Sequence, residues 1–370
     1  MNSKKYSVFI TALFSVFIGG LFIAFLLSPK RDFSDTENRV LADAPELSWE
    51  AIADGSYMEE LETYIADQFP MRDMWIVIKS ACEYALGKRE FNDVYLSGST
   101  LISKVEQPDQ SLVDKNLGYI ESFVQSVGKP VYLALIPTAA EIWKDKLPEG
   151  APGFDQEAFL QQVQQSTSAE YVDLLSALQL HKNEAIFYRT DHHWTSLGAY
   201  YGYAAFMNAA GRRPLPLSML TATTVSTEFN GTLYSSSGIR WLPSDSIETY
   251  ISADGIKVTS YPEGKPVEGT MYDESYLEKK DKYSMFMGGN TPMHVIENPN
   301  AQGGSLLVIR DSYMDSELPF LSQEYATITV LDLRYYHGSV RELAAQHDEI
   351  LISYGVANLI TDRNLVYLSR

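Results

Sequence analysis

Two short segments of the sequence carry residue types that together could perform nucleophilic catalysis. The first is RTDHHWT, residues 189–195, which lies between an extended IFY segment and an expected helix that runs from Leu197 toward Gly211. Asp191 and His193 are two residues apart, so in extended backbone their side chains face the same way. The carboxylate would then accept one imidazole proton and hold the other ring nitrogen ready as a base.

The second segment is LLVIRDSY, residues 306–313, in which Ser312 follows a buried strand and precedes a candidate helix. That position exposes a hydroxyl at the carboxyl edge of a sheet, where amides of the following turn can stabilise an oxyanion. The segment does not match G-x-S-x-G, so Ser312 could instead only cap the helix. We therefore treat Ser312 as a candidate nucleophile, with helix capping as the alternative.

Several neighbouring residues are candidates for binding rather than for proton transfer. Arg310 and Tyr313 flank Ser312 and could contact a sugar or a carboxylate, or they could be structural. Trp194 could wall the site and exclude water, or it could belong to the core. Residues 288–290, GGN, could donate to an oxyanion, although this composition is also typical of a hairpin turn.

A metal site is a competing interpretation, because the DHH run at 191–193 offers one carboxylate and two imidazoles. Adjacent histidines seldom chelate one ion together. A further ligand would be needed from His294, His337 or Asp311, and the spacing nominates none of them. We therefore expect neither a metal nor a cofactor.

Five short, continuous apolar runs predict the strands that would position these residues. Uninterrupted apolar strands are typical of a sheet that is covered on both faces, and helical stretches separate the runs. The sequence therefore predicts an α/β fold with a doubly wound, mainly parallel sheet, in which ligands gather beyond the carboxyl ends of the strands. The runs span residues 130–137, 171–175, 305–311, 326–333 and 348–355.

The amino-terminal segment predicts a membrane anchor. Residues 6–29 carry no charge and are long enough to cross about 30 Å of hydrocarbon as a helix. Lys4 and Lys5 favour a cytoplasmic amino terminus, although Lys30 and Arg31 weaken the asymmetry. A cleaved signal peptide is the alternative, but no small-x-small cleavage site follows the run. We expect a single-pass membrane protein whose carboxyl-terminal domain lies outside the cytoplasm.

Composition narrows the class of protein further. The 370 residues include 29 basic and 48 acidic side chains, a net charge of −19, which disfavours a nucleic-acid partner. Cys82 is the single cysteine, so an internal disulfide framework and a cysteine-rich zinc module are both excluded. With 45% apolar residues the chain can bury a substantial core.

We expect three regions along the chain. Residues 1–30 form the transmembrane anchor, and residues 31–105 form a tether and a helical lead-in with helices near 58–69 and 71–87. The remainder, 106–370, forms the α/β domain. Within it, residues from about 211 to 300 are rich in Thr, Ser, Gly and Tyr, which predicts a β-rich insertion.

The TDHHWT segment, far upstream of a strand that ends in DSY, resembles the pattern of the bacterial DHHW family. That family is similar to the SGNH-like O-acetyltransferases that modify alginate and other exported polysaccharides. Asp191, His193 and Trp194 match the Asp-x-His-Trp pattern, and Asp311 with Ser312 matches the serine motif. The order of the motifs agrees with the permuted acetyltransferase branch of those enzymes.

Two features depart from the resemblance, which spans roughly residues 50–370. Arg310 stands where a glycine is expected, and an arginine side chain changes how closely the backbone can approach a substrate. The glycine and asparagine blocks that form the oxyanion hole of SGNH hydrolases are not recognisable.

The resemblance implies a Ser-His-Asp triad in which Ser312 is the nucleophile, His193 the general base and Asp191 its orienting carboxylate. It implies a membrane-anchored, extracytoplasmic O-acyltransferase that acetylates hydroxyls of an exported or cell-wall polysaccharide. Acetyl-CoA is cytoplasmic, so a polytopic membrane partner would supply the acetyl group. A carbohydrate esterase with the same triad is one alternative. A non-catalytic glycan-binding or scaffold ectodomain is another, which Arg310 in place of glycine favours.

Overall fold

The computed structural model describes residues 3–34, 36–37 and 39–370. Residues 1–2 of the expected anchor and residues 35 and 38 of the expected tether lie outside the described residues. The chain divides into two compact units. One contains the chain up to Lys88 with Gly238–Arg240, and the other contains Arg89–Ser237 and Trp241–Arg370.

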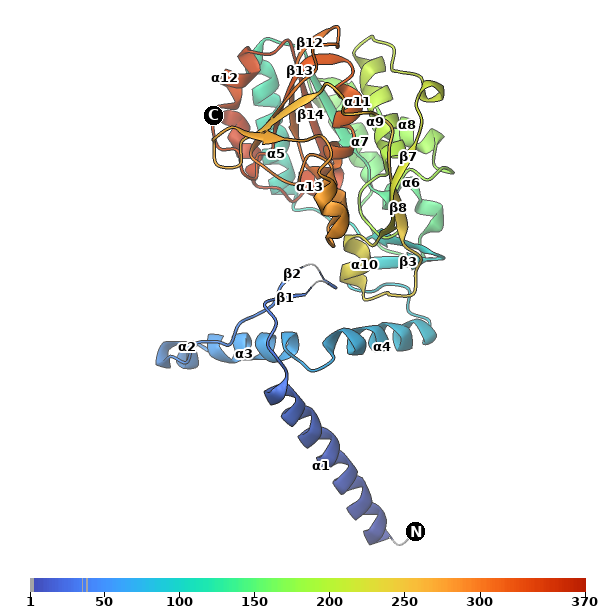
Figure 1. Cartoon of the computed structure of the whole chain (residues 1–370), viewed down its shortest axis with the longest axis vertical. Helices are drawn as coiled ribbons and strands as arrows, with labels where there is room; N and C mark the ends of the chain where they lie inside the picture. Colours follow the sequence, from blue (N-terminus) through green and yellow to red (C-terminus); the bar gives the residue numbers. More distant parts are fainter. Residues whose placement is uncertain (1–2, 35, 38) are drawn as a thin grey trace. The chain divides into compact units, whose positions relative to one another are not determined.

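The first unit begins with the long apolar helix α1 (Ser3–Leu27), drawn in dark blue in Figure 1. Its segment Lys4–Leu27 has a mean hydropathy of 2.5 and is long and apolar enough to cross a membrane. A helix of this kind near an amino terminus serves either as a single-pass anchor or as a signal sequence.

Three further helices and a short strand pair complete the first unit. Asp67 is the last residue of the helix at 56–67, and its carboxylate is buried. It accepts hydrogen bonds from the Arg39 guanidinium at 2.9 Å and from the Ala42 amide at 2.9 Å. These bonds join that helix to the segment after the strand pair. The elements are β1 (Phe33–Ser34), β2 (Arg39–Val40), α2 (Trp49–Asp54), α3 (Ser56–Asp67) and α4 (Arg72–Ala85).

The second unit is built on an eight-stranded sheet with the order β10-β9-β11-β13-β12-β14-β5-β6. The strands from β13 to β6 pair in parallel, whereas β10, β9 and β11 add on antiparallel beside β13. The parallel strands are β5 (Val131–Ile136), β6 (Glu170–Val172), β12 (Gly303–Arg310), β13 (Tyr325–Leu331) and β14 (Glu349–Gly355).

Four of the five predicted apolar runs coincide with β5, β12, β13 and β14, and the prediction of a mainly parallel α/β sheet is confirmed. The run at 171–175 overlaps β6 only as far as Val172, and its last two residues begin α8. All six residues of β5 are buried, as are the last six of β14, which accounts for the unbroken apolar sequence. The register places Arg310 of β12 beside Ser353 of β14, so their carboxyl ends lie level at one edge.

The region expected as a β-rich insertion has two structural parts. The strands β7 (Thr223–Phe229) and β8 (Asp245–Thr249) form a separate two-stranded sheet. The remaining three strands extend the central sheet instead of forming a sheet of their own. They are β9 (Lys257–Ser260), β10 (Val267–Gly269) and β11 (Met293–Glu297).

Helices cover both faces of the sheet (Figure 1), with α5 (Gln110–Val127) and α12 (Val340–Ala345) on one side and α8 (Leu174–Leu180) and α9 (Ser196–Ala209) on the other. The other elements of this unit are β3 (Val94–Ser97), β4 (Thr100–Ser103), α6 (Ala139–Ile142), α7 (Gln156–Ser166), α10 (Thr232–Ser237), α11 (Leu318–Leu321), α13 (Val356–Leu359) and the 3-10 helices at 144–146, 217–219, 274–278, 282–285, 312–316 and 364–369.

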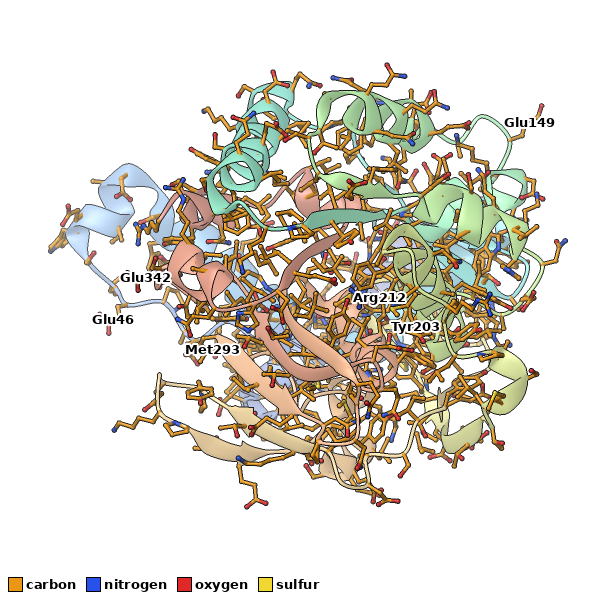
Figure 2. All side chains as sticks on the ribbon, turned by 90° about the horizontal axis from the view of Figure 1, so that it is seen from above. Glu46, Glu149, Tyr203, Arg212, Met293 and Glu342 are labelled. Atoms are coloured by element: carbon orange, nitrogen blue, oxygen red, sulfur yellow. The ribbon has the colours of Figure 1, made fainter. Side chains whose placement is uncertain are left out.

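Side chains fill the space between the strands and these helices (Figure 2). On α9, the ring of Phe206 meets Tyr132 of β5 edge-on at 5.1 Å. Tyr203 of α9, labelled in Figure 2, hydrogen-bonds to Glu324 just before β13. This packing fixes the helix that begins directly after the DHHW segment.

Candidate active site

The end of β12 presents Ser312 at the carboxyl edge of the sheet. Asp311 caps the 3-10 helix η5 (Ser312–Ser316), because its side chain accepts the Tyr313 amide at 3.0 Å. Ser312 is the first residue of this turn and is partly exposed. The capping role considered for Ser312 therefore belongs to Asp311, and the Ser312 hydroxyl is available for other contacts.

Asp311 also fixes the turn to the neighbouring strand. Its Oδ2 accepts hydrogen bonds from the Gly355 amide at 2.7 Å and from the Asn358 side chain at 2.7 Å. Burial raises the pKa of Asp311, although these hydrogen bonds oppose the change. The loop that carries Ser312 is thus held by the end of β14.

The DHHW segment is positioned by α9 and by a short bridge. Thr195 caps α9, since its hydroxyl accepts the Gly198 amide at 3.2 Å. Trp194 pairs with Phe187 in an isolated β-bridge. A Cβ at Gly202 would lie 2.6 Å from the Trp194 ring, so the absent side chain at 202 makes room for the indole.

Asp191, His193 and Ser312 form one continuous chain of hydrogen bonds. The Nδ1 of His193 lies 2.6 Å from Oδ1 of Asp191, and its Nε2 lies 2.9 Å from the Ser312 hydroxyl. Asp191 is 3% exposed and His193 6%, so the pair is shielded from water. An ionised carboxylate accepts the Nδ1 proton and leaves the Nε2 lone pair facing the serine hydroxyl.

Two further hydrogen bonds join segments that are about 120 residues apart in the chain. The indole of Trp194 donates to the Tyr313 carbonyl at 2.7 Å, and the Tyr313 hydroxyl donates to the His192 carbonyl at 2.5 Å. The rings of Trp194 and Tyr313 also meet edge-on at 6.0 Å. These contacts fix the DHHW segment against the turn that begins at Ser312.

Thr232 and Gly231 hold the far side of the Asp191 carboxylate. The Thr232 amide and hydroxyl lie 2.7 and 3.0 Å from Oδ2, and a side chain at Gly231 would collide with this carboxylate. Burial alone raises the pKa of Asp191, but the imidazoles of His192 and His193 and the hydrogen bonds outweigh it. The net effect holds the pKa of Asp191 well below its ordinary value, so the group is ionised.

Tyr283 is a part of the site that the sequence did not indicate. It lies in the 3-10 helix η4 (Lys282–Met285), and its ring stacks on His193 at 3.9 Å with an interplanar angle of 11°. Its hydroxyl lies 3.1 Å from the carbonyl oxygen of Ser312. Burial raises the pKa of Tyr283 well above its usual value, so the hydroxyl stays protonated and able to donate. One side chain therefore positions both the imidazole and the serine.

We expect Tyr283→Phe to lower kcat by about three- to tenfold, because the ring is kept and only the neutral hydrogen bonds of the hydroxyl are lost. Tyr283→Leu also loses the flat face against His193, so we expect a reduction of roughly 100-fold, with little change in KM. Both reductions in kcat are measured as turnover of p-nitrophenyl acetate, with protein whose thermal stability shows that each variant is folded. Equal effects of the two variants would contradict a role for the stacked ring.

The structure places Arg310, Tyr313 and Trp194 in the interior, with 1%, 3% and 0% of their surfaces exposed. The Arg310 guanidinium pairs with Asp315 at 2.9 Å and with Asp332 at 3.3 Å. Burial raises the pKa of Asp315 to about 7, although Arg310 opposes the change. The substrate contact predicted for these three residues has no exposed surface to act through, and they support the site from behind.

Residues 288–290 contribute to this internal network. The Asn290 side-chain oxygen accepts from Arg310 at 3.2 Å and from Arg334 at 3.1 Å. Arg334 also binds Asp332 at 2.6 Å. The Asn290 side chain therefore connects this loop to charged residues at the ends of β12 and β13.

Asp191, His192 and His193 place ligand atoms within 4.8 Å of one another, as a metal site would require. The protein already uses most of these atoms. Both ring nitrogens of His193 are hydrogen-bonded, and Nδ1 of His192 lies 2.7 Å from the Thr232 hydroxyl. A metal ion bound to His193 would have to replace the contact with Asp191 or the contact with Ser312, so the arrangement fits a proton relay better than a metal centre.

Comparisons with known proteins show the family and the fold of this chain. The chain is 24% identical over 161 residues to the probable alginate O-acetylase AlgJ of Pseudomonas syringae pv. tomato, covering 40% of this chain and 41% of that protein. It therefore spans about two fifths of the length of this curated relative.

Two solved structures resemble most of the chain. One is a DHHW family protein from Eubacterium siraeum, with 25% identity and a TM-score of 0.63, covering 76% of this chain and 98% of that one. The other is Bacillus cereus PatB1 with a sulfonyl adduct, with 20% identity and a TM-score of 0.62, covering 74% and 99%. The family model described as DHHW protein matches residues 129–331, which is more than half of the chain. The chain is therefore a member of the DHHW protein family.

Proposed function

We propose that this protein is a membrane-anchored O-acyltransferase that acetylates hydroxyls of an exported or cell-wall polysaccharide. The observation that carries the proposal is the unbroken hydrogen-bond chain from Asp191 through His193 to the Ser312 hydroxyl, at the carboxyl edge of the sheet. A buried, ionised carboxylate, an oriented imidazole and a partly exposed hydroxyl are the groups that acyl transfer requires. In this proposal Ser312 is the nucleophile, His193 the general base and Asp191 its orienting group.

The reaction would proceed in two balanced steps. His193 Nε2 takes the Ser312 proton while Oγ bonds to the acetyl carbon, and the same proton passes to the leaving group of the donor as its bond breaks. A sugar hydroxyl then gives its proton to His193 as its oxygen bonds to the acetyl carbon. The bond to Ser312 Oγ breaks, and the proton returns to Oγ. No cofactor takes part.

The backbone amide of Ser312 is our candidate donor for the oxyanion. Amides at the start of a helix lack partners within it. The Asp311 carbonyl and carboxylate take the amides of Met314 and Tyr313, and within residues 3–34, 36–37 and 39–370 the structure records no acceptor for the Ser312 amide. This N–H is therefore free to stabilise negative charge that develops beside the hydroxyl.

The wider setting of the proposal rests on the apolar helix α1 and on relatives. An AlgJ relative named for alginate O-acetylation supports a polysaccharide as acceptor, and the likeness to PatB1 supports an SGNH-like fold. The helix α1 supports single-pass anchoring, and Lys4 and Lys5 before its apolar run support an α/β unit outside the cytoplasm. An acetyl donor made in the cytoplasm would then require a polytopic membrane partner to deliver it.

The test supplies p-nitrophenyl acetate as donor, with and without alginate-derived and chitin-derived oligosaccharides, and follows acetate and acetylated product by mass. Acetylation that depends on the oligosaccharide is the expected result. Release of acetate alone from an acetylated glycan would assign a carbohydrate esterase. Folded protein whose Ser312 is not labelled by a fluorophosphonate would overturn catalysis and favour a glycan-binding or scaffold ectodomain.

A further inference from the structure

His192 stands beside the proposed relay, and the proposed mechanism does not use it. Its ring centroid lies 3.9 Å from that of His193 with a tilt of 37°. About a third of its side chain is exposed, whereas His193 is almost fully enclosed. His192 therefore brings a second imidazole to the accessible side of the site.

Hydrogen bonding assigns the proton on this second imidazole. The Thr232 hydroxyl lies 3.0 Å from Oδ2 of the ionised Asp191 and 2.7 Å from Nδ1 of His192. Thr232 has one hydroxyl proton, and the carboxylate can only accept it. The Thr232 oxygen must then accept from His192, so His192 carries its proton on Nδ1 and a lone pair on Nε2.

The two imidazoles point the same way. Nδ1 of His193 and Nδ1 of His192 lie 2.6 and 3.6 Å from the same Asp191 oxygen. Nε2 lies across each ring from Nδ1 and the two rings lie 3.9 Å apart, so both Nε2 atoms are directed away from this Asp191 oxygen. Within the described part of the chain, the structure records no protein partner for the Nε2 of His192.

His192 is suited to accept a hydrogen bond and not a proton. Burial and a positive charge on His193 together lower the pKa of His192 to about 4, although Asp191 opposes both. A base at neutral pH works best with a pKa near that pH. The neutral imidazole therefore offers an acceptor that hydroxyl groups can use without protonating it.

We propose that Nε2 of His192 accepts a hydrogen bond from a second hydroxyl of the acyl acceptor, next to the hydroxyl that His193 deprotonates. The acceptor class is a vicinal diol, as sugars provide. This inference rests on the proposed function and concerns only its second step. His192 would make the acetyl-enzyme prefer a diol over a simple alcohol or water.

Two variants test the roles of the two His192 ring nitrogens separately. The amide of His192→Asn reaches the place of Nδ1 and keeps the bond to Thr232 but leaves nothing at Nε2. The longer His192→Gln places its amide near Nε2 and can accept there. The acetyl-enzyme formed from p-nitrophenyl acetate is offered 1,2-propanediol or 1-propanol, and the ratio of ester to acetate is measured for each alcohol.

We expect His192→Asn to lower the ratio for 1,2-propanediol by about three- to tenfold and to leave the ratio for 1-propanol unchanged, with His192→Gln closer to wild type. Without added alcohol, the first-turnover burst of nitrophenol and the fluorophosphonate labelling of Ser312 should persist in both variants, because neither removes Ser312, His193 or Asp191. An unchanged diol preference in His192→Asn would overturn the inference, as would loss of labelling, which would place His192 in the relay itself. If the wild-type protein forms no acetyl-enzyme, the proposed function itself is overturned. This result is obtained with the wild type alone, so it is distinct from the comparison of the His192 variants.

Discussion

Ser312→Ala is expected to lower acetyl transfer by roughly 10⁴-fold or more, with the fold unchanged. The Ser312 hydroxyl is the atom at 2.9 Å from His193 Nε2, and alanine leaves no group to form the ester. The residue is partly exposed, so removing its hydroxyl creates no large cavity. Turnover of p-nitrophenyl acetate by the variant and the wild type, at matched concentrations, gives the rate ratio.

A matched control is Ser275→Ala. Ser275 is exposed in the 3-10 helix η3 (Glu274–Glu278) and has no part in the hydrogen-bond chain. This variant should retain wild-type turnover and thermal stability. Turnover by Ser312→Ala within tenfold of the wild type would show that the reaction does not pass through this serine.

Asp191→Asn is expected to cause the second largest loss, about 10³- to 10⁴-fold in kcat. Oδ1 of Asp191 accepts from the His193 amide and ring, and Oδ2 accepts from the Thr232 amide and hydroxyl. An amide can accept on one side only. With its oxygen toward Thr232 it imposes the wrong His193 tautomer, and with its oxygen toward His193 it lacks the charge that stabilises an imidazolium.

The control for this variant is Asp245→Asn. Asp245 is another buried carboxylate, at the start of β8, and it holds the same loop by accepting from the Arg189 and Thr190 amides at 3.1 and 2.8 Å. The Asp245→Asn variant should have a lower melting temperature than the wild type. Its kcat, calculated per folded molecule, should stay close to the wild-type value. If Asp245→Asn lost as much kcat as Asp191→Asn, the loss would come from loop packing and not from the proton relay.

The central parallel sheet could be predicted because burial on both faces leaves a local signal. The strands β5, β12, β13 and β14 each contain a short apolar run that can be recognised without knowledge of its partners. The sequences of the antiparallel strands give a weaker signal of where those strands lie in the sheet. β11 alternates between buried and partly buried residues, and its neighbours β9 and β13 lie at different distances along the chain. The sequence therefore indicated β structure in this region but not that it would extend the central sheet.

The same distinction applies to the site. Asp191 and His193 are two residues apart, so local backbone geometry suffices to bring them together. Tyr283 and Thr232 reach the site from loops whose paths depend on the whole fold, and neither has a residue pattern of its own. Arg310 was a candidate for substrate contact because it flanks Ser312, but it is buried, and Asp315 and Asp332 compensate its charge inside the protein. Pairing across strands cannot be read from spacing.

The most direct test of the account is to locate the acyl group on the protein. Wild-type protein is mixed with p-nitrophenyl acetate, quenched in acid within the first turnover, digested and mapped by mass spectrometry. We predict one added acetyl group on the peptide that contains Ser312, and none on that peptide in Ser312→Ala or on the control Ser275. An acetyl group that accumulates elsewhere, or turnover by the wild type with Ser312 never modified, would contradict the proposed nucleophile.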